Sequence, residues 1–266
     1  MEKVIFITQK ELLKYWSKKY NRIYFGIEFC QNLIPKLKEV QEVFEFTQKH
    51  GIGFSYVTPF VTEKGLKKLE EHFQYLKRKK KNIEIVINDL GILRLLSKKF
   101  KGIFTLILGR LLIKHKRDPT IFKFLDKIPI KAAEHFKQSN VNVPAFQEFL
   151  IKKDIRRVEM DNLLQGIGDD LSHSKIKASL YYPYAYLTTT RLCLVNSCDI
   201  NKYSDRIGIF PCKRECQRYS FTLTHKSIPV DLFLEGNTLF FKNQKLPKYL
   251  DEKGINRIIY QPKIPL

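Results

Sequence analysis

The stretch "RIYFGIEFC", Arg22 to Cys30, contains the local pattern that decides the fold. Its first half is a short apolar run rich in aromatic and β-branched side chains, which is typical of a buried strand. Helical periodicity follows from about Leu33 to His50. A short strand followed by an amphipathic helix is the repeating unit of a parallel sheet with crossover helices. The stretch therefore predicts a chain built from βα units.

The same alternation continues on both sides of this stretch. We expect eight strands, at residues 4–8, 22–26, 53–59, 83–89, 102–110, near 139–144, at 156–162 and within 177–190. Eight such units fit a closed (β/α)8 barrel of the TIM type. An open doubly wound α/β sheet is the alternative, but the GxGxxG fingerprint that usually accompanies it is absent from the sequence.

The pattern changes in the last third of the chain. "SFTLTH", "PVDLFLEG" and "TLFFKN" alternate like antiparallel strands, with a hairpin turn expected at residues 235–237, and "RIIYQP" predicts one more strand. We therefore expect a barrel over residues 1–190. Residues 191–266 are expected to form a cysteine-rich segment and a β-rich carboxyl-terminal extension packed on the barrel.

Composition sets limits on the class of protein. The 266 residues are 44% hydrophobic and 28% charged, which is ordinary for a folded protein and argues against disorder. The net charge of +21 raises the possibility of an RNA partner, because clustered cations gain affinity by releasing phosphate counterions. The lysines, however, are spread over nearly every predicted helix, which favours a solvated lysine-rich surface.

The start of the chain lacks the long apolar stretch of a secretory signal, and no segment approaches the roughly 20 apolar residues that span a bilayer. We therefore expect no membrane span and a cytoplasmic protein. In a reducing cytosol, clustered cysteines are more often metal ligands or redox groups than structural disulfides.

Four of the five cysteines lie close together in the sequence, as Cys193, Cys198, Cys212 and Cys216. Thiolates are soft ligands that hold zinc or an iron-sulfur cluster. The CxxC pairs of zinc ribbons are missing, which favours iron-sulfur, but the spacing alone leaves both metals open.

The fifth cysteine, Cys30, follows the second predicted strand, whereas Cys193 follows the eighth. In a closed barrel the carboxyl ends of these strands lie on one face, where barrels place their sites. All five cysteines are therefore candidate metal ligands.

Three further residues are candidates for catalysis or substrate binding. Asp89 and Asp161 end the fourth and seventh predicted strands, where a carboxylate can act as a general base, although Asp89 fits a helix cap equally well. Arg191 lies beside Cys193 in the sequence and suits bidentate binding of an anionic substrate. Glu159 is expected to face the barrel interior, with Arg110 as a candidate partner.

The same segments resemble a known family. "RIYFGIEFC" is similar to the tyrosine-x-glycine-x-x-x-cysteine segment of the UbiU/UbiV-like iron-sulfur proteins, most of all UbiV members, within the collagenase-like peptidase U family. "FSYVTP", "INDLG", "RVEMDN" and "YAYLTTTRLC" resemble later segments of that family, in the same order over roughly residues 1–220.

This resemblance implies a [4Fe-4S] cluster held by Cys30, Cys193, Cys212 and Cys216. The extra Cys198 and a longer loop before Cys212 depart from the family pattern, so the fourth ligand is either Cys30 or Cys198. The match of the whole segment around Cys30 favours that residue.

The resemblance also implies a class of reaction. Family members carry out oxygen-independent hydroxylation, either in ubiquinone biosynthesis or on bases of RNA, with prephenate as the small-molecule hydroxyl donor and, for UbiV, a paralogous UbiU-like partner subunit. No nucleophile motif supports peptidase activity. The alternative from another class is a non-enzymatic, zinc-stapled RNA-binding protein, which the charge of +21 favours.

Overall fold

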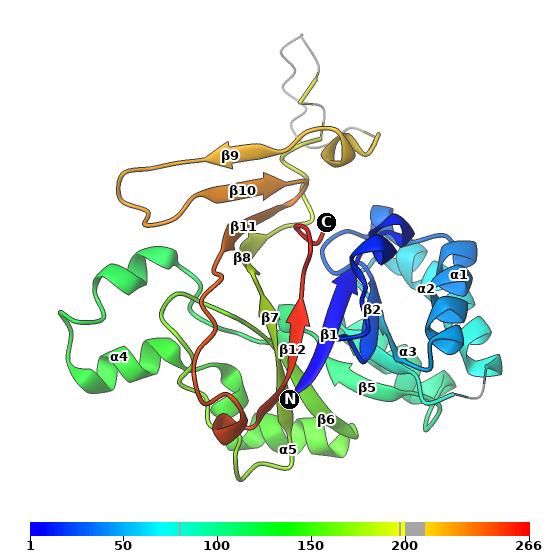
Figure 1. Cartoon of the computed structure of the whole chain (residues 1–266), viewed down its shortest axis with the longest axis horizontal. Helices are drawn as coiled ribbons and strands as arrows, with labels where there is room; N and C mark the ends of the chain where they lie inside the picture. The colour runs from blue at the N-terminus through cyan, green and yellow to red at the C-terminus, as the bar shows by residue number, and fades with distance from the viewer. Residues whose placement is uncertain (80, 197, 200–210) are drawn as a thin grey trace.

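Eight parallel strands close into a barrel in a computed structural model that describes residues 1–79, 81–196, 198–199 and 211–266 (Figure 1). Around the barrel the strands follow the order β1-β12-β7-β6-β5-β4-β3-β2, which confirms the predicted fold class. Their bounds are β1 Glu2–Ile7, β2 Arg22–Gly26, β3 Gly53–Val57, β4 Glu84–Ile87, β5 Thr105–Leu108, β6 Ile155–Asp161, β7 Lys177–Tyr182 and β12 Ile255–Tyr260.

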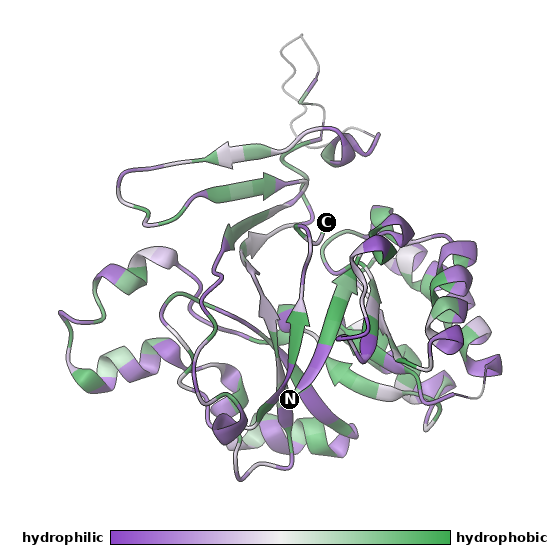
Figure 2. Cartoon of the chain, in the orientation of Figure 1, coloured by the Kyte–Doolittle hydropathy of each residue, from purple (hydrophilic) through white to green (hydrophobic). Residues whose placement is uncertain are grey.

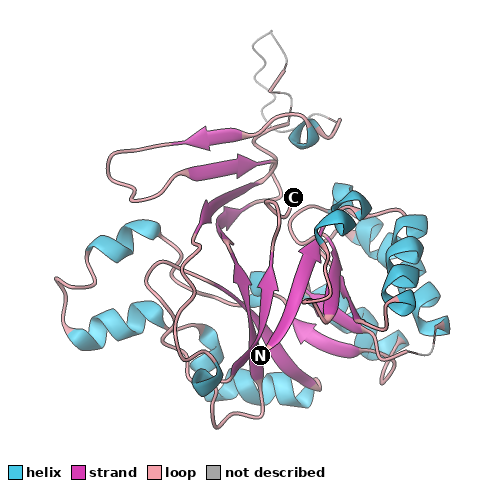
Figure 3. Cartoon of the chain, in the orientation of Figure 1, coloured by secondary structure: helices cyan, strands magenta, loops and turns pink. Residues whose placement is uncertain are grey.

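The α-helices of the described residues lie in the connections between β2 and β6 and cover the outside of the barrel (Figure 3). They are α1 Leu37–Lys49, α2 Glu63–Arg78, α3 Leu90–Lys99, α4 Ile130–Lys137 and α5 Pro144–Lys152. In α2 the side chains of Leu69, Phe73 and Leu76 recur at helical spacing and are buried, so one face packs against the sheet. Its last turn carries Lys77 and Arg78, whose charges complement the carboxyl end of the helix dipole.

The barrel interior is packed with side chains. Val4, Phe6, Tyr24, Val57, Val86, Ile107, Tyr181 and Ile259 form one buried cluster drawn from seven of the eight strands. Strand residues of the opposite parity, such as Ile5, Ile23 and Phe25, belong to a larger cluster that includes the helices. This alternation follows from the two-residue period of a strand. Because the inward-facing side chains fill the interior, the barrel encloses a packed core and no open channel.

A second, antiparallel sheet stands at the carboxyl ends of the barrel strands (Figures 1 and 3). Its order is β8-β11-β10-β9, with β8 Tyr184–Thr189, β9 Phe221–Leu223, β10 Leu232–Glu235 and β11 Thr238–Lys242. Apolar residues run along its strands, as the hydropathy colouring shows (Figure 2). Glu235 pairs with Thr238, so Gly236 and Asn237 form the two-residue hairpin turn that the sequence predicts.

One predicted strand is absent, and two others are arranged differently from the prediction. Residues 139–144 contain a 3-10 turn, Asn140–Asn142, instead of a strand, because Ser139 caps the turn and Pro144 begins α5. The predicted eighth strand is broken at Pro183 into β7, which belongs to the barrel, and β8, which belongs to the second sheet. The strand that closes the barrel between β7 and β1 is β12, which we had placed in the extension.

In the part of the chain that the structure describes, no helix combines the length and apolar character needed to cross a bilayer.

Candidate metal centre

Separate parts of the chain bring the cysteines together. Cys30 follows β2 and directly precedes a 3-10 turn, Gln31–Leu33. Cys193 follows β8, which leaves the barrel for the second sheet. Cys216 lies in another 3-10 turn just before β9. Docking of the second sheet on the carboxyl end of the barrel is therefore what places these residues side by side.

Four cysteine side chains line one cavity of about 190 Å³: Cys30, Cys193, Cys212 and Cys216. All five cysteines of the chain are free thiols. Cys198 is exposed and is not among the described residues that line the cavity. The structure thus brings Cys30, and not Cys198, to the other three.

The thiols of this cavity affect one another's protonation. Burial, followed by the proximity of Cys193, Cys30 and Cys212, raises the pKa of Cys216 to about 12. Burial also raises the pKa of Cys30, and Cys212 and Cys193 act in the same direction. The raised pKa values of Cys30, Cys193 and Cys216 favour the neutral thiol without a bound cation, so a soft metal that binds must displace their protons.

Backbone N–H groups of the residues that follow Cys30 and Cys193 approach the sulfurs of these two cysteines. Burial has the largest effect on the Cys30 pKa, but the N–H groups of Asn32 and Leu33 oppose it. Cys193 has the same arrangement, with the N–H groups of residues 195–196 lowering a pKa that burial raises. Such donors stabilise a thiolate over a thiol. These donors partly offset the effect of burial, although the pKa of both thiols stays above its ordinary value.

The four cysteines line a cavity, and their side chains are not close enough together to bind a single metal ion. Within the described residues, no three His, Cys, Asp or Glu side chains are grouped closely enough to hold a metal ion. The donor set around the cavity is nevertheless all thiol, which suits soft metals and iron-sulfur clusters.

A second cavity, of about 260 Å³, adjoins the first, because Cys30 and Arg191 line both. The Arg191 guanidinium lies 5.6 Å from the centre of the Phe60 ring, and its Nη2 donates to the Val61 carbonyl at 3.4 Å. None of the ion pairs found among the described residues includes Arg191. Its guanidinium therefore lines both cavities without a carboxylate partner among the described residues.

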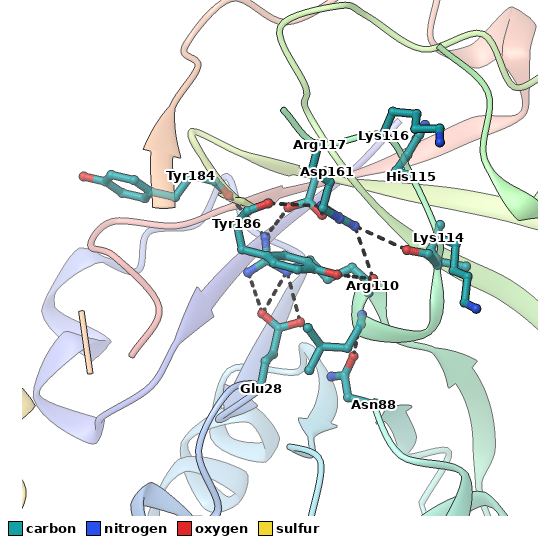
Figure 4. A network of polar contacts seen from close by, with 12 residues as sticks. Glu28, Asn88, Arg110, Lys114, His115, Lys116, Arg117, Asp161, Tyr184 and Tyr186 are labelled. Atoms are coloured by element: carbon teal, nitrogen blue, oxygen red, sulfur yellow. Dashed lines mark hydrogen bonds and ion pairs between the residues drawn. The ribbon is translucent and has the colours of Figure 1, made fainter. Parts of the chain in front are cut away.

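A buried network of charges fills the mouth of the barrel (Figure 4). Arg110 Nη2 donates to Glu28 Oε2 at 2.6 Å, and its Nη1 donates to Asp161 Oδ1 at 2.7 Å. Arg117 donates to the other Asp161 oxygen at 2.5 Å. Glu28, Arg110 and Asp161 are fully buried. Two cations thus neutralise two anions where a barrel usually places its reactive groups.

This network decides the position of Asp161, one of the predicted catalytic residues. Burial acts to raise its pKa, but Arg117 and Arg110 outweigh burial and hold the pKa of Asp161 below its ordinary value. Both carboxylate oxygens accept hydrogen bonds from arginine. A carboxylate in this state stabilises the mouth of the barrel and is poorly suited to accept a proton.

Asp89 is placed as a helix cap. Its Oδ1 accepts from the Gly91 N–H at 2.6 Å, and its Oδ2 accepts from the Val61 N–H at 3.1 Å. The residue is the N-cap of α3. Of the two interpretations that the sequence left open, this geometry fits the cap.

Glu159 faces the barrel interior as expected, but its partner is not Arg110. Its Oε1 accepts from the Tyr24 hydroxyl at 2.9 Å, and its Oε2 has no hydrogen-bond partner among the described residues. Burial raises the pKa of Glu159 to about 8. Arg110 instead forms ion pairs with Glu28 and Asp161.

Fold and site together define a closed α/β barrel protein with a cysteine-lined cavity beside its mouth. No family model matches the sequence, and no curated protein matches it. The comparison with solved structures finds the U32 peptidase Mk0906 at 10% identity and a TM-score of 0.48, covering 100% of this chain and 94% of that one. It also finds a glycoside hydrolase family 18 N-acetylglucosaminidase from Paenibacillus barengoltzii at 8% identity and a TM-score of 0.36, covering 97% and 94%.

The sequence identities and TM-scores of both matches are too low to assign this chain to a family or an activity. The assignment of a closed barrel is based on the order in which the strands pair. The resemblance of the sequence to the UbiU/UbiV-like proteins stays a prediction.

Sequence reasoning missed two parts of the site. Glu28, two residues before Cys30, was not singled out, although a lone acidic residue in the apolar run "YFGIEFC" is a signal of a buried ion pair. Asn237 was treated only as a turn residue, whereas its side chain contacts the backbone next to Cys30. Nothing local in the sequence identifies that contact.

Proposed function

We propose that this chain is an iron-sulfur protein in which Cys30, Cys193, Cys212 and Cys216 hold a [4Fe-4S] cluster. The observation that carries the proposal is that these four thiols, from distant parts of the chain, line one cavity. Tetrathiolate coordination is the usual ligand set of such clusters.

The size of the cavity supports a cluster over a single zinc ion. Zinc held by four cysteines sits about 2.3 Å from each sulfur and leaves no free volume between them. The cavity that the four thiols line together with seven other residues has a volume of about 190 Å³, which is larger than one ion requires. The N–H groups near Cys30 and Cys193 fit either metal, because both bind thiolates.

The reaction that we propose is an oxygen-independent hydroxylation, or a related redox modification, of a quinone precursor or an RNA base. A bound cluster supplies one-electron redox chemistry at this place. The chain's own part is to bind and orient: the cavity of about 260 Å³ opens beside Cys30, and Arg191 presents its guanidinium there. A small anionic hydroxyl donor such as prephenate suits this cation, since a guanidinium binds a carboxylate through two hydrogen bonds.

Partners follow from the same proposal. A chain with a net charge of +21 is suited to an RNA substrate or to an acidic, UbiU-like partner subunit. A peptidase activity is not proposed.

The second candidate function is a non-enzymatic RNA-binding protein stapled by zinc. The charge favours it, together with Lys213, Arg214 and Arg218, which are exposed around the last two cysteines. This candidate requires the four thiols to move closer together around one ion.

Purification without oxygen tests the proposal. We expect a brown protein with close to four iron and four sulfide per chain. Cys30→Ser abolishes this content, whereas Cys198→Ser, the matched control, leaves it intact. A colourless protein that contains one zinc per chain contradicts the proposal and favours the second candidate. Loss of the cluster in Cys198→Ser with retention in Cys30→Ser overturns the ligand assignment.

A further inference from the structure

The turn between β10 and β11 lies against the cysteine cavity. Gly236 and Asn237 form this turn, and both line the cavity with the four cysteines. Gly236 has a φ of +55°, a left-handed conformation that favours glycine. The second sheet thus contributes a backbone turn to the site.

The side chain of Asn237 joins two segments that carry cysteines. Its Nδ2 donates to the Phe29 carbonyl at 2.7 Å and to the Thr190 carbonyl at 2.5 Å. Phe29 directly precedes Cys30 in the sequence. Thr190 lies a few residues before Cys193 and also donates its own N–H to the Asn237 carbonyl at 3.1 Å. One amide group therefore ties the end of β2 to the end of β8.

The neighbouring Gly236 meets the remaining segments. Its carbonyl accepts from the Val195 N–H at 3.3 Å, which holds the chain just after Cys193. A Cβ placed on Gly236 would lie 3.2 Å from Cys216 Cβ and 3.7 Å from its sulfur. The turn is thus in contact with three of the four cysteine segments through its two residues.

We propose that Asn237 is the positioning residue of the cysteine centre, and that its amide sets the distance between Cys30 and Cys193. The proposal rests on the proposed function where it concerns the cluster, but the juxtaposition of the thiols does not depend on a metal. Asn237 is 6% exposed, so its amide hydrogens have no water to bond to if the two carbonyls move away. Both carbonyls in turn lose a buried donor if the amide is removed.

The chemistry of the amide makes the proposal specific. An aspartate has the same shape, but its carboxylate cannot donate to two carbonyl oxygens and repels them. It also brings a negative charge next to thiolates, which raises their pKa and weakens metal binding. Asn237→Ala removes the donors without adding charge.

Asn243 offers a matched control. Its Nδ2 donates to two backbone carbonyls, those of Asn162 at 3.2 Å and Leu163 at 3.4 Å, at the other end of β11. Asn243→Ala therefore removes the same kind of tether from the same sheet, but away from the cysteines.

The first measurement uses the metal-free chain. A short bis-maleimide cross-links Cys30 to Cys193 or Cys216 when the thiols are close, and peptide mass spectrometry quantifies the product. We expect the yield in Asn237→Ala and Asn237→Asp to fall on the order of tenfold relative to wild type, and Asn243→Ala to match wild type. Equal yields in Asn237→Ala and Asn243→Ala overturn the positioning role. Circular dichroism confirms that each variant is folded, and Asn237→Ser, which keeps one donor, serves where Asn237→Ala does not fold.

The second measurement uses the anaerobically loaded protein. We expect the cluster of Asn237→Ala to decay in air about tenfold faster than that of Asn243→Ala, with a changed electron paramagnetic resonance spectrum after reduction. Equal decay and identical spectra contradict the proposal. If the wild-type chain binds no iron, the proposed function fails, whereas the cross-linking result still decides whether Asn237 positions the thiols.

Discussion

Arg110 and Glu28 are 82 residues apart in the sequence, yet their side chains form a fully buried ion pair with a shortest distance of 2.6 Å. Glu28 stands two residues before Cys30, so this pair fixes the start of the loop that carries the distal cysteine. The ion pairs at the barrel mouth therefore help to hold Cys30 at the cysteine cavity.

Arg110→Met is expected to destabilise the protein by about 3–5 kcal/mol, because it leaves Glu28 and Asp161 buried without their main partner. Urea unfolding followed by circular dichroism measures the change. The control is Lys99→Met, which breaks an exposed pair with Glu70 and is expected to cost less than about 1 kcal/mol. A similar small cost for Arg110→Met would show that the network is not a stabilising unit.

Glu159 predicts a pH dependence of stability. Burial raises its pKa in the folded state to about 8, above the ordinary value of 4.5, so the folded state binds more protons than the unfolded state between these values. Its contribution is fully present below about pH 4.5 and is lost as the pH rises through about 8. Because Glu159→Gln cannot ionise, the free energy of unfolding of the variant relative to wild type should increase over this window. A difference that stays constant with pH contradicts the prediction.

Asp89→Ala is expected to lower the free energy of unfolding by about 1 kcal/mol, because the N–H groups of Gly91 and Val61 lose their acceptor. Iron content and ligand binding should not change. Asp89→Asn keeps one oxygen acceptor and should cost less. Loss of activity with unchanged stability in Asp89→Asn would instead support the catalytic interpretation.

Arg191→Gln is expected to weaken binding of prephenate, or of another small carboxylate, roughly 10- to 100-fold without changing stability. Isothermal titration of the anaerobic protein measures the affinity. Arg218→Gln is the control, because this arginine is also near the cysteines but pairs with Asp199 at 3.0 Å and does not line the cavity. Equal effects of the two substitutions would indicate a general charge effect and no specific site.

The early strands were predictable because each is a short apolar run with its own helix. β1 to β5 all lie within or close to the predicted segments, since burial on both faces of a parallel strand leaves a clear local signal. The residues 139–144 misled the prediction because Val141 and Val143 alternate with polar residues, while the capping of the turn by Ser139 depends on local hydrogen bonds that an apolar pattern does not reveal. β12 was recognised as a strand but given to the wrong sheet.

The candidate site was predictable in part for the same reason. Thiol chemistry and the barrel rule together pointed to Cys30 and Cys193 on one face, and the structure places them in one cavity. The prediction took Cys193 to follow a strand of the barrel, whereas it follows β8, which belongs to the second sheet. Cys193 nevertheless lies beside Cys30, because the second sheet stands at the carboxyl ends of the barrel strands.

By itself the sequence determined the βα repeat and the set of thiols available to a metal, and it favoured a closed barrel over an open sheet, because these depend on residue type and local periodicity. Only the tertiary structure decided which strand closes the barrel, that Cys198 stays outside the cavity, and that Asn237 joins Phe29 to Thr190. Those outcomes depend on pairings between residues far apart in the chain. The local sequence around an apolar strand or an amide side chain does not indicate which distant residue it contacts in the folded protein.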